Sequence, residues 1–405
     1  MRRPWHKLSS ISRSISPRSN DHFAAKRFPC SRNQRGIKDT TDDFTLVVAE
    51  ASCAAAGLFT QSRFAGPSVL VSREHVADGK ALGVVVISKN ANVATGVEGM
   101  NNAREVVAGV ARAIGCNDNE ILIASTGVIG RQYPMDKVRA GLAALPAQPQ
   151  GTSADDVARG IMTTDTVSKV AQCEVTGSGA RVVGVAKGVG MIEPNMATLI
   201  TLIFTDAEIS SPDLQTMFQR VIARTFNCVS VDTDTSTSDT AIVLASGKAG
   251  KADMAALEHA LFDVALSLTK QVARDGEGAE KLIEVCVDNA RDYEQAKTVA
   301  KAIVNSPLVK TAVHGADPNW GRVAMAVGKC SQYTDIDQAS VIIRFGTQEV
   351  YPRQIGADDL SALSTYMKGA DVRIHVALNT GTESATVWGC DLTAGYVRIN
   401  ADYTT

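Results

Sequence analysis

The first candidate residues whose types and spacing could do chemistry lie in the stretch from Lys187 to Phe204. Its first half, up to Asn195, holds glycines and a proline, which interrupt regular structure and allow close backbone approach. Its second half, from Thr198 on, is a run of β-branched and apolar residues that is typical of a buried strand. A threonine therefore stands where a loop enters a core strand.

A free threonine hydroxyl is a weak nucleophile and needs a base. A cut between Ala197 and Thr198 would supply one, because the new α-amine of Thr198 would titrate near ~7.7–8.0 when unperturbed. The small side chain of Ala197 would hinder attack on its carbonyl very little. Thr198 is thus either a nucleophile that cleavage generates or simply the first residue of a strand.

A second candidate lies at residues 125–130, directly after the apolar run 121–124. A strand that breaks at Thr126 and Gly127 presents backbone N–H groups, which are the donors of an oxyanion hole. A plain turn is the alternative, because glycines end many strands.

Three other stretches carry polar groups that could bind a small molecule. Residues 163–166, Thr-Thr-Asp-Thr, form a hydroxyl cluster where a helix should stop. Glu277 lies between two glycines, so it is either presented to an ammonium group at a loop tip or exposed in a solvated turn. Residues 231–240 lack the glycine and the glutamate that a calcium loop requires at its sixth and twelfth positions, so we expect a polar loop that lines a cleft or an interface.

Composition excludes several classes of protein. The chain has 405 residues, of which 45% are hydrophobic and 21% charged, enough for one large α/β body or two to three domains. The net charge of −2 offers no basic surplus for nucleic acid, and no apolar run reaches transmembrane length. We therefore expect neither a nucleic acid nor a membrane as partner.

The eight cysteines and six histidines are scattered, without a Cys-x-x-Cys or a paired histidine. This pattern argues against a zinc site or a disulfide framework and favours a reducing compartment, so we expect no metal, no cofactor and a cytoplasmic location. Residues 1–40 carry basic residues among many serines before the first acid, and are expected to be a disordered or a targeting tail. A transit peptide there would instead make the protein mitochondrial or otherwise organellar.

Strands and helices interleave along the chain, which predicts an α/β class with helix-covered mixed sheets. Strands are expected at residues 44–49, 69–72, 83–88, 121–124, 198–204 and 341–345, with others starting near 372, 385 and 396. Helices are expected at 102–114, 152–162, from 211, and at 252–272, 292–304 and 358–367, and residues 173–186 resemble a hairpin.

Five motifs, in this order, together resemble the ornithine acetyltransferase family, also called glutamate N-acetyltransferase, of arginine biosynthesis. They are residues 125–130, 163–166, 187–198, 275–278 and 317–322. The likeness runs from about residue 42 to the end. Residues 59–67 and 391–400 look nearest to the branch found in clavulanic acid gene clusters.

This resemblance implies that the precursor cuts itself between Ala197 and Thr198. The products would be an α chain, folded over residues 41–197, and a β chain of residues 198–405, which stay associated as an α2β2 heterotetramer. Thr198 is then the nucleophile that accepts the acetyl group. The implied fold is an α/β sandwich shared with self-processing aminopeptidases.

The resemblance also implies the remaining site residues and the reaction. Thr126 and Gly127 match the oxyanion-hole positions. Substrate-binding positions are matched by Lys187, Glu277, Asn400, Thr405 and one of Thr163 and Thr164. The implied reaction moves the acetyl group of N2-acetylornithine to glutamate through acetyl-Thr198, giving ornithine and N-acetylglutamate.

Two alternatives remain at the level of sequence. In a threonine amidase or aminopeptidase, water rather than glutamate would resolve the acyl-enzyme, and in a non-catalytic amino-acid-binding protein Thr198 would be structural. The sequence also leaves open whether acetyl-CoA is a second acetyl donor and whether the pathway is primary arginine synthesis or a specialised one.

Overall fold

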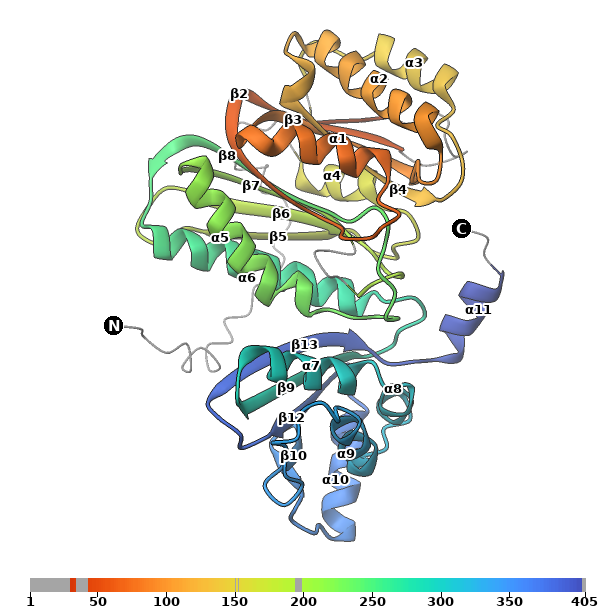
Figure 1. Cartoon of the computed structure of the whole chain (residues 1–405), viewed down its shortest axis with the longest axis vertical. Coiled ribbons are helices and arrows are strands. Elements are labelled where there is room, and N and C mark those ends of the chain that lie inside the picture. Colours follow the sequence, from red (N-terminus) through yellow and green to blue (C-terminus); the bar gives the residue numbers. More distant parts are fainter. Residues whose placement is uncertain (1–29, 34–42, 150, 152, 194–198, 403–405) are drawn as a thin grey trace.

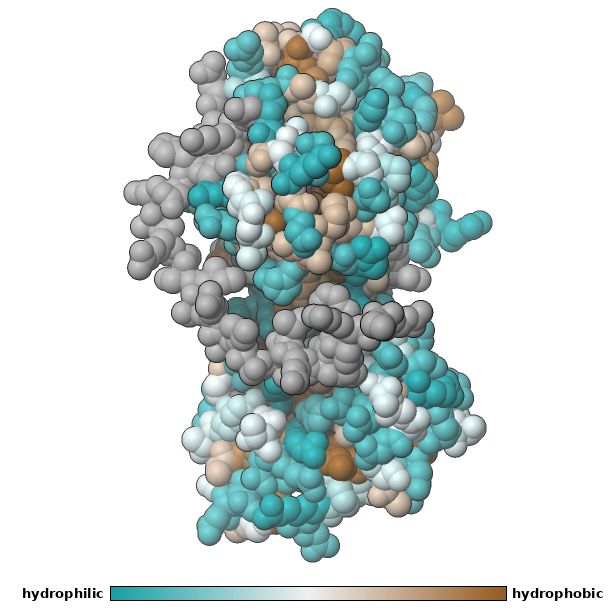
Figure 2. Space-filling model, turned by 90° about the vertical axis from the view of Figure 1, so that its left-hand side faces the viewer, coloured by the Kyte–Doolittle hydropathy of each residue, from teal (hydrophilic) through white to brown (hydrophobic). Residues whose placement is uncertain are grey.

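The computed structural model describes residues 30–33, 43–149, 151, 153–193 and 199–402. They form a larger lobe around an eight-stranded sheet and a smaller lobe around a five-stranded sheet (Figure 1). Figure 2 shows hydrophilic residues over most of the face that each lobe presents in that view. No helix in the described part of the chain combines the length and apolar composition needed to cross a bilayer.

The strands are β1 (Cys30–Asn33), β2 (Phe44–Phe59), β3 (Lys80–Asn90), β4 (Ile121–Val128), β5 (Lys169–Glu174), β6 (Arg181–Lys187), β7 (Ile200–Glu208), β8 (Thr240–Lys251), β9 (Leu282–Ala290), β10 (Ile342–Phe345), β11 (Gln348–Tyr351), β12 (Asp371–Ala377) and β13 (Glu383–Cys390). The α-helices are α1 (Pro67–His75), α2 (Gly96–Ile114), α3 (Met135–Ala143), α4 (Ala154–Ile161), α5 (Ser211–Arg224), α6 (Met254–Arg274), α7 (Tyr293–Val304), α8 (Pro307–His314), α9 (Trp320–Gly328), α10 (Ala357–Met367) and α11 (Ala394–Asp402). Short 3-10 turns lie at Val76–Asp78, Asp118–Glu120 and Phe226–Cys228.

The larger sheet runs in the order β4-β3-β2-β8-β7-β6-β5, with β1 paired to the start of β2. The pairs β3/β4 and β7/β8 are parallel and the others antiparallel, and the pairing of β2 is irregular between Val48 and Cys53. Thr126 on β4 lies in hydrogen-bond contact with Lys187 on β6, although four strands separate β4 from β6 in this order. The sheet therefore folds over at β2, so that its two halves face each other.

Alternating strand residues fill the space between the two halves. Leu122 from one half and Val185 and Phe204 from the other belong to the same buried cluster, together with Val157 and Ile161 of α4. On the outer faces, α1, α2 and α3 cover β2 to β4, and α5 and α6 cover β5 to β8 (Figure 1). These helix-strand-strand-helix layers confirm the predicted α/β sandwich with helix-covered mixed sheets.

The smaller sheet runs in the order β11-β10-β12-β9-β13, with β9 and β12 parallel. Its core continues through α6 into the core of the larger lobe, so the two lobes share one hydrophobic cluster. After β13 the chain leaves the smaller lobe as α11, in which no residue is buried (Figure 1).

Two of the expected strands are wrong. Residues 69–72 belong to α1, which begins at Pro67 and buries Val69 and Val71. Proline is favoured in the first helical turn, so this signal outweighs a short apolar run that fits either element. Tyr396 likewise lies in α11 instead of a strand. The other expected elements are present with shifted ends, and residues 30–33 of the expected tail pair with β2 as β1.

Candidate active site

The predicted oxyanion motif lies where β4 ends beside β3. Thr126 pairs with Ser88, and the register then shifts at Lys89 and Asn90. Gly127 has a φ of +127°, and a Cβ there would lie 2.2 Å from the carbonyl carbon of Lys89. Only glycine fits this conformation and this close approach. The strand does not break at Thr126 and Gly127 as predicted, because β4 continues to Val128, but its register with β3 shifts beside these two residues.

Lys187 is the last residue of β6, opposite Ile200 at the start of β7. Its Nζ donates a hydrogen bond of 3.2 Å to Oγ1 of Thr126, and only 8% of the residue is exposed. Burial lowers the pKa of the Lys187 ammonium group, and the nearby carboxylate of Asp165 opposes this shift. The motif that precedes Thr198 and the predicted oxyanion motif therefore meet in space.

Asp165 joins two of the predicted substrate-binding segments. Its Oδ1 accepts the N–H of Gly188 at 2.7 Å, and its Oδ2 accepts the N–H of Thr163 at 3.0 Å. The side chain has no exposed surface. Burial by itself would raise the pKa of this carboxyl, but Lys187 and Lys169 more than offset it and lower the pKa to about 2. Asp165 is therefore an anion that holds the Thr163 loop against the end of β6.

Lys169 extends this network to a third segment. Its Nζ lies 2.7 Å from Oδ1 of Asp165 and 2.5 Å from Oδ2 of Asp275. Asp275 in turn accepts the N–H and the hydroxyl of Thr166. This buried chain of charges ties residues 163–166 to the end of α6, two residues before Glu277.

Glu277 lies against the loop that follows β6. Its N–H donates to the carbonyl of Val189 at 2.9 Å, and its Oε2 accepts Nδ2 of Asn400 at the same distance. Beside it, burial together with the charges of Asp232 and Glu277 raises the pKa of Tyr396 to about 12. Helix α11 therefore lies over Glu277, and Asn400 reaches the site from the end of the chain.

The polar loop at residues 231–240 holds the segment just before the expected cleavage point. Asp232 accepts the N–H groups of Met191 and Ile192 at 2.6 and 2.7 Å. Glu193 accepts the hydroxyl of Ser230 at 2.8 Å and pairs with Lys301 at 3.3 Å. This loop thus lines an internal interface, one of the two roles expected for it.

The structure brings five of the predicted site residues into one region: Thr126, Gly127, Lys187, Glu277 and Asn400. Asp165 ties Thr163 to the same region through its backbone, which leaves open the choice between Thr163 and Thr164. Ala197, Thr198 and Thr405 lie outside the described residues. The catalytic and binding roles of all these residues stay predictions.

Sequence reasoning missed the buried network of Asp165, Lys169 and Asp275. One signal was present, because Lys169 begins strand β5 only four residues after Asp165. The third member lies 106 residues beyond Lys169, so only the fold brings it there.

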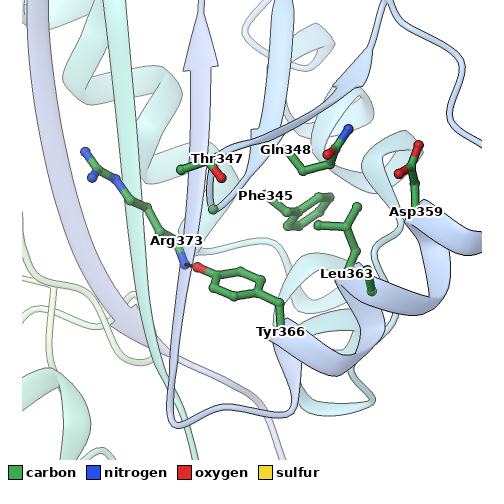
Figure 3. A pocket seen from close by; sticks show the side chains of 9 residues that line it. Phe345, Thr347, Gln348, Asp359, Leu363, Tyr366 and Arg373 are labelled. Atoms are coloured by element: carbon green, nitrogen blue, oxygen red, sulfur yellow. Dashed lines mark hydrogen bonds between the residues drawn. The ribbon is translucent and has the colours of Figure 1, made fainter.

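The motif at residues 317–322 lies in the smaller lobe and begins α9. Trp320 stacks on Tyr351 with ring centres 5.0 Å apart, and Arg322 donates to the carbonyl of Leu308 at 2.8 Å. These contacts are structural. A surface pocket of about 410 Å³ also belongs to this lobe, between the β10–β11 hairpin and α10, lined by Phe345, Leu363 and Tyr366 among others (Figure 3). No predicted site residue lines it.

Among the described residues, Glu280, His314 and Asp391 form a cluster of metal-ligand types, with their donor atoms within 4.8 Å of one another. Asp391 Oδ1 already accepts the N–H groups of Glu280 and Lys281 at 2.9 Å, and Oδ2 lies 3.0 Å from Nδ1 of His314. Such bonding is typical of a buried aspartate that fixes local structure, here beside a partly exposed histidine.

The fold thus brings the predicted oxyanion motif at the end of one strand close to the motif that precedes the predicted nucleophile. The ArgJ family model matches residues 30–405. A protein of Nostoc sp. called arginine biosynthesis bifunctional protein ArgJ 2 is 56% identical over 370 residues, which are 91% of this chain and 95% of that protein. The glutamate N-acetyltransferase Oat2 of Streptomyces clavuligerus is 56% identical over 372 residues, covering 91% and 94% of the two chains.

Among solved structures, an ornithine acetyltransferase complexed with ornithine from Mycobacterium tuberculosis matches 42% of this chain and 92% of that chain, with 32% identity and a TM-score of 0.39. From the family match and the curated relatives, the chain belongs to the ArgJ family, and the family predicted from the sequence is confirmed.

Proposed function

We propose that this chain is a self-processing glutamate N-acetyltransferase that moves the acetyl group of N2-acetylornithine to glutamate through an acetyl ester on Thr198. The enzyme class and its place in arginine biosynthesis follow from membership of the ArgJ family. The observation that carries the mechanism is the 3.2 Å contact between Lys187 and Thr126, because it joins the segment that leads to Thr198 with the predicted oxyanion hole.

Self-cleavage would hydrolyse the peptide bond between Ala197 and Thr198 with one water molecule. The acyl carbon of Ala197 gains the hydroxyl and becomes a carboxylate, and the nitrogen of Thr198 becomes a free amine. That amine would be the base that the threonine hydroxyl needs.

The transfer itself would proceed in two acyl-transfer steps. Thr198 Oγ attacks the acetyl carbonyl while its proton passes to the α-amine, and the resulting oxyanion is stabilised by Thr126 and Gly127. The C–N bond then breaks, and the α-amine returns the proton to the leaving ornithine. The amine of glutamate attacks the acetyl ester in the same way, so that N-acetylglutamate leaves and the hydroxyl regains its proton.

The charges in the site suit two amino-acid substrates. Lys187 supplies a cation, and Glu277 supplies an anion that Asn400 orients at 2.9 Å. Charge-assisted hydrogen bonds to a carboxylate or an ammonium group are about twice as strong as neutral ones. We assign Glu277 to the side-chain ammonium of ornithine, and replacement by glutamine should weaken binding on the ornithine side.

The strand order explains how two cleaved chains would stay together. Residues before the cut supply β1 to β6, and residues after it supply β7 and β8. Because β8 pairs with β2 and β7 pairs with β6, the second chain would lie within a sheet of the first. The two chains should therefore separate only on denaturation. Assembly into α2β2 and a cytoplasmic location stay predictions.

The deciding experiment combines intact mass spectrometry and N-terminal sequencing with an acetyl-transfer assay. We expect a second chain that begins at Thr198, and Thr198→Ala should remain one chain and lose transfer by more than about 10³-fold. Thr201→Val is the matched control, because Thr201 lies on the strand that follows Thr198 and its hydroxyl donates to the carbonyl of Val185 on the neighbouring strand β6 at 3.1 Å. Transfer by an uncleaved wild-type chain would refute the mechanism.

The same assay separates the alternatives. Release of free acetate without glutamate would indicate an amidase, and no turnover at all would indicate a binding protein. Acetyl-CoA in place of N2-acetylornithine tests for a second acetyl donor.

A further inference from the structure

The direction of the Lys187–Thr126 hydrogen bond fixes what Thr126 can do. An ammonium group can only donate, so Oγ1 of Thr126 is the acceptor in this bond. The hydroxyl proton of Thr126 is therefore not used toward Lys187 and can be donated to another acceptor. In an oxyanion hole, that acceptor is the negatively charged oxygen.

The surroundings of Lys187 restrict where its ammonium group can lie. The side chain is buried at the end of β6, and the next residue, Gly188, is tied to Asp165 at 2.7 Å. Asp165 itself is held by Lys169 and by the backbone of Thr163. The buried network thus holds the backbone directly after Lys187, and the charge of Asp165 acts on the ammonium group itself.

From these contacts we propose that Lys187 serves the reaction through Thr126. The ammonium group donates to Oγ1 of Thr126, Thr126 donates its own proton to the oxyanion, and Asp165 is the positioning residue that holds Lys187. This inference rests on the proposed acetyl transfer and assigns Lys187 a role beyond attraction of a substrate carboxylate.

The physical gain comes from polarisation. In a chain of hydrogen bonds each bond strengthens the next, and a full positive charge at one end makes the terminal hydroxyl a stronger donor. The effect grows as negative charge develops on the substrate oxygen, so it acts on the transition state more than on the bound substrate. Lys187 and Thr126 both keep their protons throughout.

A double-mutant cycle on kcat of the cleaved enzyme tests this role. The variants are Thr126→Val, Lys187→Met and the pair, with N2-acetylornithine and glutamate saturating. Each single change should lower kcat by about 10²–10³-fold, as loss of an oxyanion donor does. If Lys187 acts through Thr126, the double variant should be no more than about threefold slower than Thr126→Val alone. If the loss of kcat in the double variant instead equals the product of the two single losses, the proposal is wrong.

The split between KM and kcat gives an independent readout. A lysine that only attracts a substrate carboxylate would, when replaced by methionine, raise KM and leave kcat unchanged. That result for Lys187→Met would overturn the proposal even if the cycle could not be completed.

Self-cleavage would use the same oxyanion hole as acetyl transfer. Intact mass spectrometry therefore first shows whether each variant is cleaved. Activities are compared per cleaved chain. Where a variant stays uncleaved, the same cycle is run on the cleavage rate of the purified precursor, with the same expectation and the same refutation. A wild-type enzyme that fails to transfer acetyl groups refutes the proposed function, whereas a working enzyme with multiplying effects refutes only this inference.

The pH profile tests Asp165. The charged groups that face Lys187 are Asp165, Lys169, Asp239 and Glu277, and of the acids Asp165 acts most strongly to raise the pKa of Lys187. Asp165→Asn should therefore move the alkaline limb of the kcat profile to lower pH.

The control for this profile is Asp206→Asn, because Asp206 also accepts a backbone N–H, that of Arg181 at 2.7 Å, but does not face Lys187. The alkaline limb of the kcat profile of Asp206→Asn should stay at the pH of the parent enzyme. If the alkaline limb of Asp165→Asn also stays there, Asp165 does not act on Lys187 as proposed.

Discussion

Two lysines, Lys281 before β9 in the smaller lobe and Lys187 at the end of β6 in the larger lobe, are each 8% exposed, yet they bond differently. The Nζ of Lys281 donates to the carbonyls of Val313, His314 and Met367 at 2.8 to 3.1 Å. All three of its protons are therefore satisfied by backbone acceptors. Among the described residues, the ammonium group of Lys187 has only the hydroxyl of Thr126 at hydrogen-bond distance.

The difference shows why burial alone does not identify a chemical group. A buried cation with every donor satisfied stabilises the segments that it joins. A buried cation with donors to spare costs stability, and the pKa of Lys187 is lowered by burial for this reason. We therefore expect substitutions in the two lobes to separate stability from catalysis.

The largest expected effect concerns Lys169. Like that of Lys281, its buried ammonium group has hydrogen-bond acceptors around it, but these include the carboxylates of Asp165 and Asp275. Lys169→Met would leave Asp165 and Asp275 buried without the cation between them. Removal of one partner from a buried charge network costs about 3–5 kcal/mol. Chemical denaturation of the uncleaved Thr198→Ala precursor measures this loss.

Lys270→Met is the matched control, because Lys270 pairs with Glu284 at 3.0 Å while 40% exposed. It should cost at most about 1 kcal/mol. Equal losses in the two variants would show that the buried network does not hold the site together.

The next effect compares Lys281 and Lys187 directly. Lys281→Met should cost about 2–3 kcal/mol, since it leaves buried carbonyls without a donor, and should leave kcat unchanged. Lys187→Met should change stability by less than about 1 kcal/mol, because it also removes a buried charge, and should lower kcat. Denaturation midpoints and acetyl-transfer rates measure the two quantities. A stability loss at Lys187 as large as that at Lys281 would break the comparison.

Local sequence signals located much of this site. The Thr-Gly pair near the end of β4, the glycine-bearing segment after β6 and the glycine-flanked Glu277 were all recognisable from residue types within a few positions. The sandwich class followed from the alternation of strands and helices. These features depend on neighbours along the chain, which the sequence displays directly.

Features that depend on distant segments were not predictable. The fold of the sheet at β2 brings Thr126 and Lys187 together across 61 positions, and Asp275 reaches Lys169 across 106. The strand expected at residues 69–72 was wrong for a different reason. A short apolar run fits either a strand or a helix, and Pro67 in the first turn favours the helix. Tyr396 lies in a helix with no buried residue, so no apolar stripe marked it.

The third effect concerns acid stability, and it sharpens the account of the buried network. The pKa of Asp165 is lowered from 3.8 to about 2 in the folded protein. The unfolded chain therefore binds a proton here that the folded chain does not, and stability of about 2 kcal/mol is present above pH ~4 and lost as the pH falls toward ~2. Asp165→Asn should remove this part of the acid dependence, measured as the difference between variant and parent precursor in denaturation midpoints. Parallel curves for the two proteins would contradict it.

The smallest effect probes the rim of the site at Gly190. A Cβ on Gly190 would lie 2.6 Å from Cδ and Oε2 of Glu277, so Gly190→Ala should push that carboxylate aside without straining the backbone. We expect KM for N2-acetylornithine to rise about three- to tenfold, equivalent to at most ~1.4 kcal/mol, with kcat and stability nearly unchanged. Gly179→Ala is the control, because no described atom lies within 4 Å of a Cβ at that hairpin position. If both variants keep the parent KM, Glu277 does not bind the ornithine side. Of the two charged residues, Lys187 and Glu277, only Lys187 would then keep its proposed role in the reaction.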